Sequence, residues 1–110
     1  MAGVVHIPYY ATGFRGDKLA EALAEVTPIS VRYGATSYGV HRSQDDRYRF
    51  LQTVAFENKL DWERFWFGPE MTKFRATSSS WYQIPVVYVW HEVVVEGTGP
   101  GANGSADAAA

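Results

Sequence analysis

The amino-acid sequence predicts an α+β domain whose elements follow the order β-α-β-β-α-β. Stretches rich in β-branched and aromatic residues recur at 4–10, 31–42, 47–56 and 84–95, a composition typical of strands. After the first and third of these, apolar residues recur every three or four positions, which indicates helices with one buried face. The 110 residues include no cysteine, so the fold cannot depend on disulfides or on thiolate metal sites.

Size and composition limit the classes of function. We expect residues 1–96 to form one domain, and the Gly- and Ala-rich residues 97–110 to be a disordered tail. The net charge is −2 and there is no long basic run, so nucleic acid is not expected as a partner. No apolar run is long enough to span a bilayer and the N-terminus does not resemble a signal peptide, so we expect no membrane partner and a cytoplasmic location.

The first strand and helix are predicted from residues 4–28. Residues 4–10 form the strand and 13–16 a turn, after which Asp17 is expected to cap a helix. Its apolar stripe consists of Leu19, Leu23 and Val26. Pro28 should end this helix, because the residue before a proline avoids the helical region.

A β-hairpin is predicted next. Residues 31–42 read as a long second strand, 43–46 as a turn and 47–56 as the third strand. Arg42, Arg47 and Arg49, with two acidic residues between them, are expected to form a solvated hairpin tip.

The second helical region starts at Asn58, a good N-cap residue. Gly68 and Pro69 should end the first helix, and Pro69 suits the first position of a new, short helix that extends through Phe74. Residues 78–80 read as a loop. The nearly continuous apolar run at 84–95 predicts a last strand that is buried on both faces.

This order is that of a ferredoxin-like fold, an antiparallel four-stranded sheet with strand order 4-1-3-2 and helices on one face. The other face would be apolar and exposed, which marks an interaction surface. We therefore expect a homodimer in which two sheets pack face to face, a dimeric α+β barrel.

Two stretches carry a resemblance to a known group. Residues 38–46 read YGVHRSQDD and are followed by Arg49-Phe50, while 61–66 read DWERFW before Gly68-Pro69. Over about residues 3–95 the chain resembles antibiotic-biosynthesis-monooxygenase-like domains of the dimeric α+β-barrel superfamily. The resemblance implies oxygenase chemistry on aromatic compounds without metal or flavin.

The chain departs from that group at two positions. Relatives often carry histidines where this chain has Phe65 and Glu70. Heme-degrading relatives use a helical histidine as iron ligand, and no histidine lies between Asn58 and Trp81. We therefore expect no heme, no other cofactor and no metal.

The three histidines are the first candidate site. In the predicted strand order, His6 and His91 lie on neighbouring antiparallel strands and at one end of the sheet, where His41 also falls. Such a pair can share a proton or bind an anion near neutral pH. The alternative is that the strand register turns the side chains to opposite faces, where each is an ordinary polar residue.

Aromatic residues are the second candidate site. Trp62 and Trp66 lie on one helical face and either line a pocket for a flat ligand or pack the core. Tyr82 and His41 are further candidate substrate-binding residues, with Tyr82 offering a hydroxyl to orient a phenol or quinone.

Two hypotheses on function remain open. The first is an enzyme, a cofactor-independent monooxygenase or a cyclase acting on an aromatic or polyketide-like small molecule. His6, His91 and Trp66 would then act in proton transfer and substrate stacking. The second is a non-catalytic binding or accessory protein, which the replacement of the relatives' histidines by Phe65 and Glu70 favours.

Overall fold

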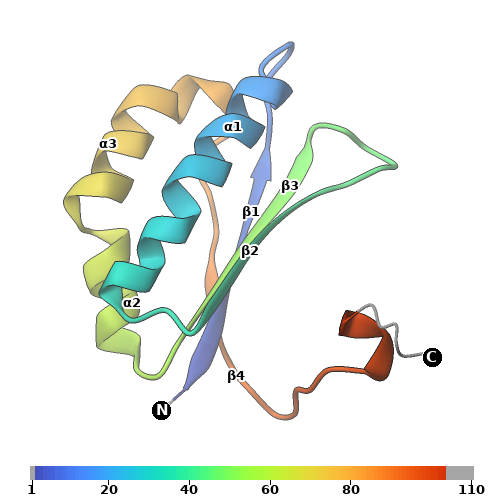
Figure 1. The fold of residues 1–110 in the computed structure, drawn as a ribbon. Coiled ribbons are helices and arrows are strands. Elements are labelled where there is room, and N and C mark those ends of the chain that lie inside the picture. Colours follow the sequence, from blue (N-terminus) through green and yellow to red (C-terminus); the bar gives the residue numbers. More distant parts are fainter. Residues whose placement is uncertain (1, 104–110) are drawn as a thin grey trace.

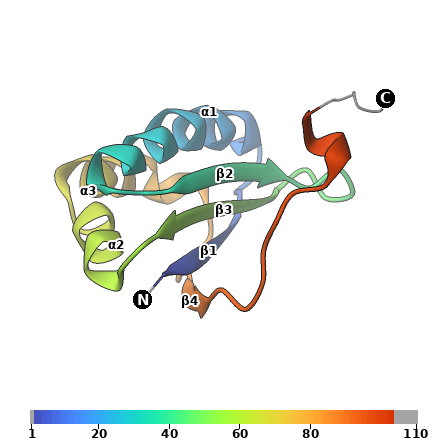
Figure 2. The same cartoon turned by 60° about the horizontal axis from the view of Figure 1, so that its bottom comes forward.

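The structure, a computed structural model, describes residues 2–103 as one antiparallel sheet with its α-helices on a single face (Figures 1 and 2). The strands are β1 (Gly3–Tyr10), β2 (Ser37–Arg42), β3 (Arg49–Phe56) and β4 (Val89–Glu92), the α-helices are α1 (Gly16–Val26), α2 (Lys59–Trp66) and α3 (Pro69–Ser78), and the 3-10 helices are η1 (Thr27–Tyr33), η2 (Ser79–Trp81) and η3 (Pro100–Asn103). The sheet order is β2-β3-β1-β4. The predicted ferredoxin-like topology is therefore confirmed.

The core lies between the sheet and the helices. Side chains alternate along β1, where Val5, Ile7 and Tyr9 are buried beneath the helices while the residues between them are more exposed. Leu19 and Leu23 of α1 are fully buried against this layer. Each such side chain contributes about 1.5–3 kcal/mol through removal from water.

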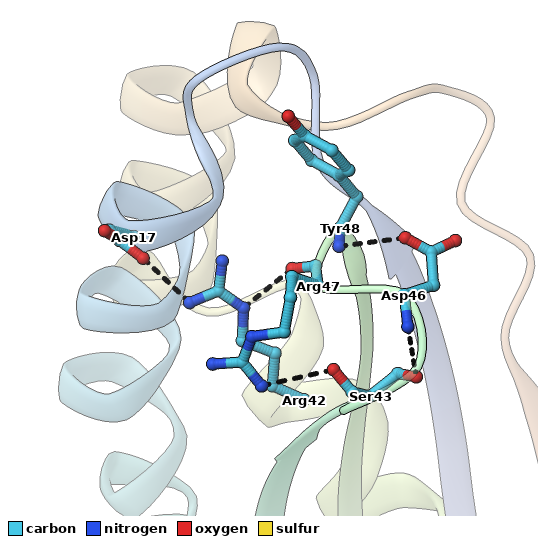
Figure 3. A network of polar contacts seen from close by, with 6 residues as sticks. All are labelled: Asp17, Arg42, Ser43, Asp46, Arg47 and Tyr48. Atoms are coloured by element: carbon cyan, nitrogen blue, oxygen red, sulfur yellow. Dashed lines mark hydrogen bonds and ion pairs between the residues drawn. The ribbon is translucent and has the colours of Figure 1, made fainter.

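The start of α1 differs from the prediction. Its N-cap is Arg15, without a side-chain cap, and Asp17 lies in the first turn. The Asp17 carboxylate accepts a hydrogen bond of 2.8 Å from Arg42 Nη1, which lowers the pKa of Asp17. Arg42 Nε also donates to the carbonyl of Arg47 at 2.7 Å, so this network ties α1 to the tip of the β2–β3 hairpin (Figure 3).

The predicted second strand at 31–42 was wrong over its first half. Residues 27–33 form η1, which has Pro28 in its first turn and is followed by the cap residue Gly34. A proline fits there because the first amides of a helix have no internal partner. Gly34 has φ +104°, a left-handed conformation that favours glycine. The strand therefore begins only at Ser37.

Two predictions about the second helical region are confirmed. The Asn58 side chain accepts a hydrogen bond of 3.0 Å from the backbone N–H of Asp61, which caps α2, and Pro69 opens α3. However, α3 continues past Phe74 to Ser78, and residues 79–81 form η2 rather than a loop. A Cβ on Gly68 would lie 2.7 Å from the carbonyl oxygen of Arg64, so the junction between the helices requires glycine.

The last predicted strand is much shorter than 84–95. Only Val89–Glu92 pair with β1, from Gly3↔Glu92 to His6↔Val89. Ile84 is 73% exposed and Val94 is 89% exposed, so burial on both faces was also wrong. Pro85 cannot donate to a strand ladder, which disfavours pairing of the segment before β4. The chain after β4 leaves the sheet on the side away from the helices (Figure 1).

Of the predicted tail, residues 100–103 form η3 and 104–110 lie outside the described residues. Within residues 2–103 there is no helix long and apolar enough to cross a membrane.

Candidate functional site

An aromatic cluster lies where α2 covers the sheet. Trp62 and Trp66 are four residues apart, so both rings point from one face of α2. Their centroids are 5.0 Å apart in a stacked arrangement. Tyr88, just before β4, completes the cluster, with its ring 4.8 Å from Trp66 and 5.3 Å from Trp62. Both tryptophans are buried, at 2% and 6% exposure.

Arg75 of α3 contributes a cation to this cluster. Its guanidinium carbon lies 4.6 Å from the centre of the Trp66 ring, and Nη2 donates a hydrogen bond of 2.7 Å to the carbonyl oxygen of Trp66. Sequence reasoning missed Arg75. The available signal was its spacing, because it follows the buried Met71 by four residues and therefore shares its helical face.

Two buried tyrosines lie in the same helix–sheet layer. Tyr82, a predicted substrate-binding residue, is buried against Tyr9, with ring centroids 5.0 Å apart. Tyr9 donates a hydrogen bond of 2.9 Å to the side chain of Gln52. Burial raises the pKa of both phenols, although the charge of Arg75 opposes the rise. At neutral pH these hydroxyls are therefore protonated, and Tyr82 can serve as a hydrogen-bond donor but not as a base.

The histidines lie on the opposite face of the sheet. The register places His91 beside Val4 and His6 beside Val89, and the two Nδ1 atoms are 2.9 Å apart. Burial, together with the nearby charge of His91, lowers the pKa of His6. His41 lies across β2–β3 from Leu51, also on the open face, but farther along the sheet.

The sheet therefore divides the predicted site residues into two groups. Alternation along β1 directs Val5 and Ile7 towards the helices and His6 away from them. Trp62, Trp66 and Tyr82 lie in the helix layer, so the histidines of the same chain do not reach a ligand held there. The sequence places the strands side by side, but which face each histidine occupies depends on the residue-by-residue register.

A groove of about 410 Å³ opens elsewhere, between α1 and α3. Its lining includes Val26, Ile29, Phe74 and Trp81, but neither Trp62 nor Trp66. Within the described part of the chain, no group of three His, Asp or Glu side chains is arranged to hold a metal ion.

Comparison with known proteins identifies the fold. No protein-family model matches the chain, and no curated protein matches it. A solved structure from Nitrosomonas europaea, provisionally named an antibiotic biosynthesis monooxygenase, has a TM-score of 0.78 at 19% identity and covers 84% of this chain and 90% of its own. A Mycobacterium tuberculosis protein has a TM-score of 0.78 at 14% identity, with 89% and 100% covered.

A third structure, from Deinococcus radiodurans and with the same provisional name as the first, has a TM-score of 0.77 at 16% identity and covers 90% of this chain and 100% of its own. The likeness extends over nearly the whole of each of these structures. The chain therefore has the ferredoxin-like α+β fold of antibiotic biosynthesis monooxygenase-like structures.

Proposed function

We propose that the protein binds a flat aromatic small molecule in the helix–sheet layer beside Trp66, and acts on it as a cofactor-independent oxygenase or cyclase. The observation that carries the proposal is the cluster of Trp62, Trp66 and Tyr88 with the Arg75 guanidinium over one ring. Such a cluster offers stacking surfaces together with a hydrogen-bond donor, which is what a phenol or quinone requires. The names of the structural neighbours agree with this class of chemistry.

In this proposal Trp62 and Trp66 hold the ring of the ligand and Tyr82 orients one of its oxygens. Oxygenation of a phenol to a quinone by O₂ places one oxygen atom on the ring and releases the other as water. Tyr88 lies across Trp66 and would have to move for a ligand to enter. No backbone pairing with a neighbouring strand holds residues 84–88, so this segment can move without breaking the sheet.

We also propose that two copies pack through their open sheet faces, with His6, His91 and His41 inside the interface. Val4, Leu51 and Ala55 are half-buried on this face, and Val89 of β4 is 49% exposed on it. In this arrangement proton exchange by His6 and His91 belongs to the dimer interface, at a distance from Trp66.

The alternative function is that of a binding or accessory protein without chemistry. It is favoured by the position of the histidines, which lie across the sheet from Trp66. It is also favoured by Phe65, which is fully buried at a position where the domains that this chain resembles often carry histidine. Binding of a naphthol without consumption of O₂ would favour this alternative over the enzyme.

Replacement of Trp66 tests the proposed binding position. The unmodified protein should bind a hydroxynaphthoquinone in a fluorescence titration, Trp66→Phe should retain binding, and Trp66→Ala should weaken it by about ten-fold or more, or 1.4 kcal/mol. Full removal of a packed tryptophan costs about 3–5 kcal/mol. In urea denaturation, Trp66→Ala should lower the free energy of unfolding by less than this, because the segment that bears Tyr88 can move into the space that the smaller side chain leaves.

Trp81→Phe is the matched control, since Trp81 lines the groove between α1 and α3. It should leave the affinity for the quinone unchanged. A full core-sized loss of stability in Trp66→Ala, together with no quinone binding by the unmodified protein, would rule out a ligand site beside Trp66.

A further inference from the structure

His6 and His91 bring two imidazole rings together on the open face of the sheet, away from the aromatic cluster. The register pairs His6 with Val89 and His91 with Val4, so the two histidines are diagonal neighbours on β1 and β4. Diagonal neighbours in an antiparallel sheet are about 7–8 Å apart, within reach of aromatic side chains. The ring centroids are 4.5 Å apart and the ring planes meet at 87°. The strand pairing therefore holds both rings at one place on this face.

The surroundings of the pair leave it open to a cation. His6 is half-buried and His91 is exposed, so an ion can reach both rings from solvent. The cross-strand neighbours of the two histidines are Val4, Thr53 and Val89. None of these three side chains carries a charge, so none of them repels a cation or neutralises one that binds to the rings.

The distance between the two facing nitrogens suits a chelated metal ion. Imidazole nitrogens bind divalent transition metals at about 2.0–2.1 Å, so two of them at a right angle around one ion lie about 2.9 Å apart. A tetrahedral ion places them about 3.3 Å apart. Right angles between neighbouring ligands are typical of Cu²⁺ and Ni²⁺. The observed separation of the two Nδ1 atoms is 2.9 Å, which favours these two ions over Zn²⁺.

An ion at this position replaces the hydrogen that the two rings share. Between two neutral imidazoles, one Nδ1 donates this hydrogen and the other accepts it. The donating ring can instead carry its hydrogen on Nε2, which leaves the lone pairs of both Nδ1 atoms for the metal. The ion lies beside the line that joins the nitrogens, so each ring has to turn. The exposure of His91 and the partial exposure of His6 leave room for this turn.

We infer that His6 and His91 form a chelating site for a divalent transition metal, with Cu²⁺ bound more tightly than Ni²⁺ or Zn²⁺ and water in the remaining coordination positions. The order of affinity is the general one for divalent metals at nitrogen ligands. Mg²⁺ and Ca²⁺ prefer oxygen ligands and should not compete. The sequence predicted no metal, because two ligands 85 residues apart form no recognisable spacing. This site does not depend on a ligand beside Trp66.

His41 provides a matched control on the same face. A Cβ on Gly39 would lie 3.2 Å from Cε1 of His41, so the His41 ring leans over Gly39. Gly39 pairs with Thr53 of β3, and Thr53 pairs with His6. The His41 ring is therefore two strands away from His6, or about 10 Å at the usual strand spacing. One ion cannot bind His41 together with the pair.

Titration with copper sulfate tests the inference. The unmodified protein should bind one Cu²⁺ per chain in calorimetry, and the electron paramagnetic resonance spectrum of the complex should show two coordinated imidazole nitrogens. His6→Gln and His91→Gln should each weaken this binding at least about ten-fold and leave one coordinated imidazole. His41→Gln should bind Cu²⁺ as the unmodified protein does.

Two sets of results would overturn the inference. If the unmodified protein does not bind one Cu²⁺ per chain, or if the spectrum shows fewer than two imidazole nitrogens, the two histidines do not chelate a metal. This measurement requires no variant, so it decides the question even if His6→Gln does not fold. If the affinity survives in both His6→Gln and His91→Gln, or falls equally in His41→Gln, the ion binds elsewhere.

Discussion

The contact between His6 and His91 is the clearest single-residue feature of the open sheet face. With Nδ1 atoms 2.9 Å apart, one ring must donate and the other accept, so the pair needs at least one neutral imidazole. The cross-strand neighbours of His6 are Thr53 and Val89, which do not titrate. Acid should therefore weaken this part of the sheet.

We expect the stability of the protein to fall as the pH drops below the ordinary histidine value of 6.5. The pKa of His6 in the folded chain lies below this value, so the unfolded chain takes up the proton first. The contribution of His6 to the free energy of unfolding is thus fully present above pH 6.5, and it is lost as the pH falls towards the lower pKa that His6 has in the folded chain. Melting temperatures measured between about pH 5 and pH 8 at one protein concentration test this.

His6→Gln should reduce the dependence of the melting temperature on pH, because it removes the shifted group. His41→Gln, on the same face but outside the pair, should retain the dependence. An equal slope in His6→Gln and in the unmodified protein would show that the pair does not control the response to acid.

Among the elements, α2 positions the aromatic cluster and depends on its cap. Asn58→Ala should destabilise the protein by about 1 kcal/mol in urea denaturation, because the backbone N–H of Asp61 loses its acceptor. Asn58→Ser should retain most of the stability, because a serine hydroxyl also caps helices. Equal stability of the alanine and serine variants would mean that the cap contributes nothing.

Helices and strands could be predicted from the sequence where the interaction that determines them is local. The cap at Asn58, the proline start of α3 and the stripe through Leu19 and Leu23 are all set within a few residues, and all were predictable. Val31 and Ile84 lie in stretches of strand-like composition, but nearby prolines disfavour strand pairing there. Composition alone does not show whether the strand-like residues or the nearby prolines determine the local structure.

The candidate site shows the same limit. The stripe of Trp62 and Trp66 was visible in the sequence, because one helix presents both rings. The burial of Arg75 was not, because it requires α3 to bring the guanidinium over a ring of α2. The face on which His6 lies depends on the residue-by-residue strand register, which the sequence does not specify.

The molecule is less compact than a chain of its length usually is, and it leaves apolar residues exposed. The Cα radius of gyration is 15.2 Å, whereas a compact chain of this length is expected at about 13 Å. The chain after β4 accounts for part of the excess, since it projects from the sheet (Figure 2) and carries Val94 and Val95, which are 89% and 87% exposed. Exposed apolar surface of this kind is typical of an interface.

Light scattering at micromolar concentration should give twice the chain mass of 12.3 kDa. Leu51→Lys, which places a charge on the open face of β3, should give a folded monomer, because burial of an unpaired charge disfavours the interface. Phe67→Lys is the control, since Phe67 is 68% exposed at the end of α2 and should leave the dimer intact. A stable monomer of the unmodified chain would contradict the proposed association.

The short pairing between β4 and β1 determines how soon β4 separates from the sheet. Four residue pairs hold β4 at the edge of the sheet, whereas β3 is paired on both sides, through eight residue pairs with β1 and six with β2. The backbone amides of β4 should therefore exchange with deuterium through a local opening, well before those of β3. Tyr88 directly precedes β4, so the same opening withdraws it from Trp66, and a ligand seated there should alter the exchange of β4 while leaving that of β3 unchanged.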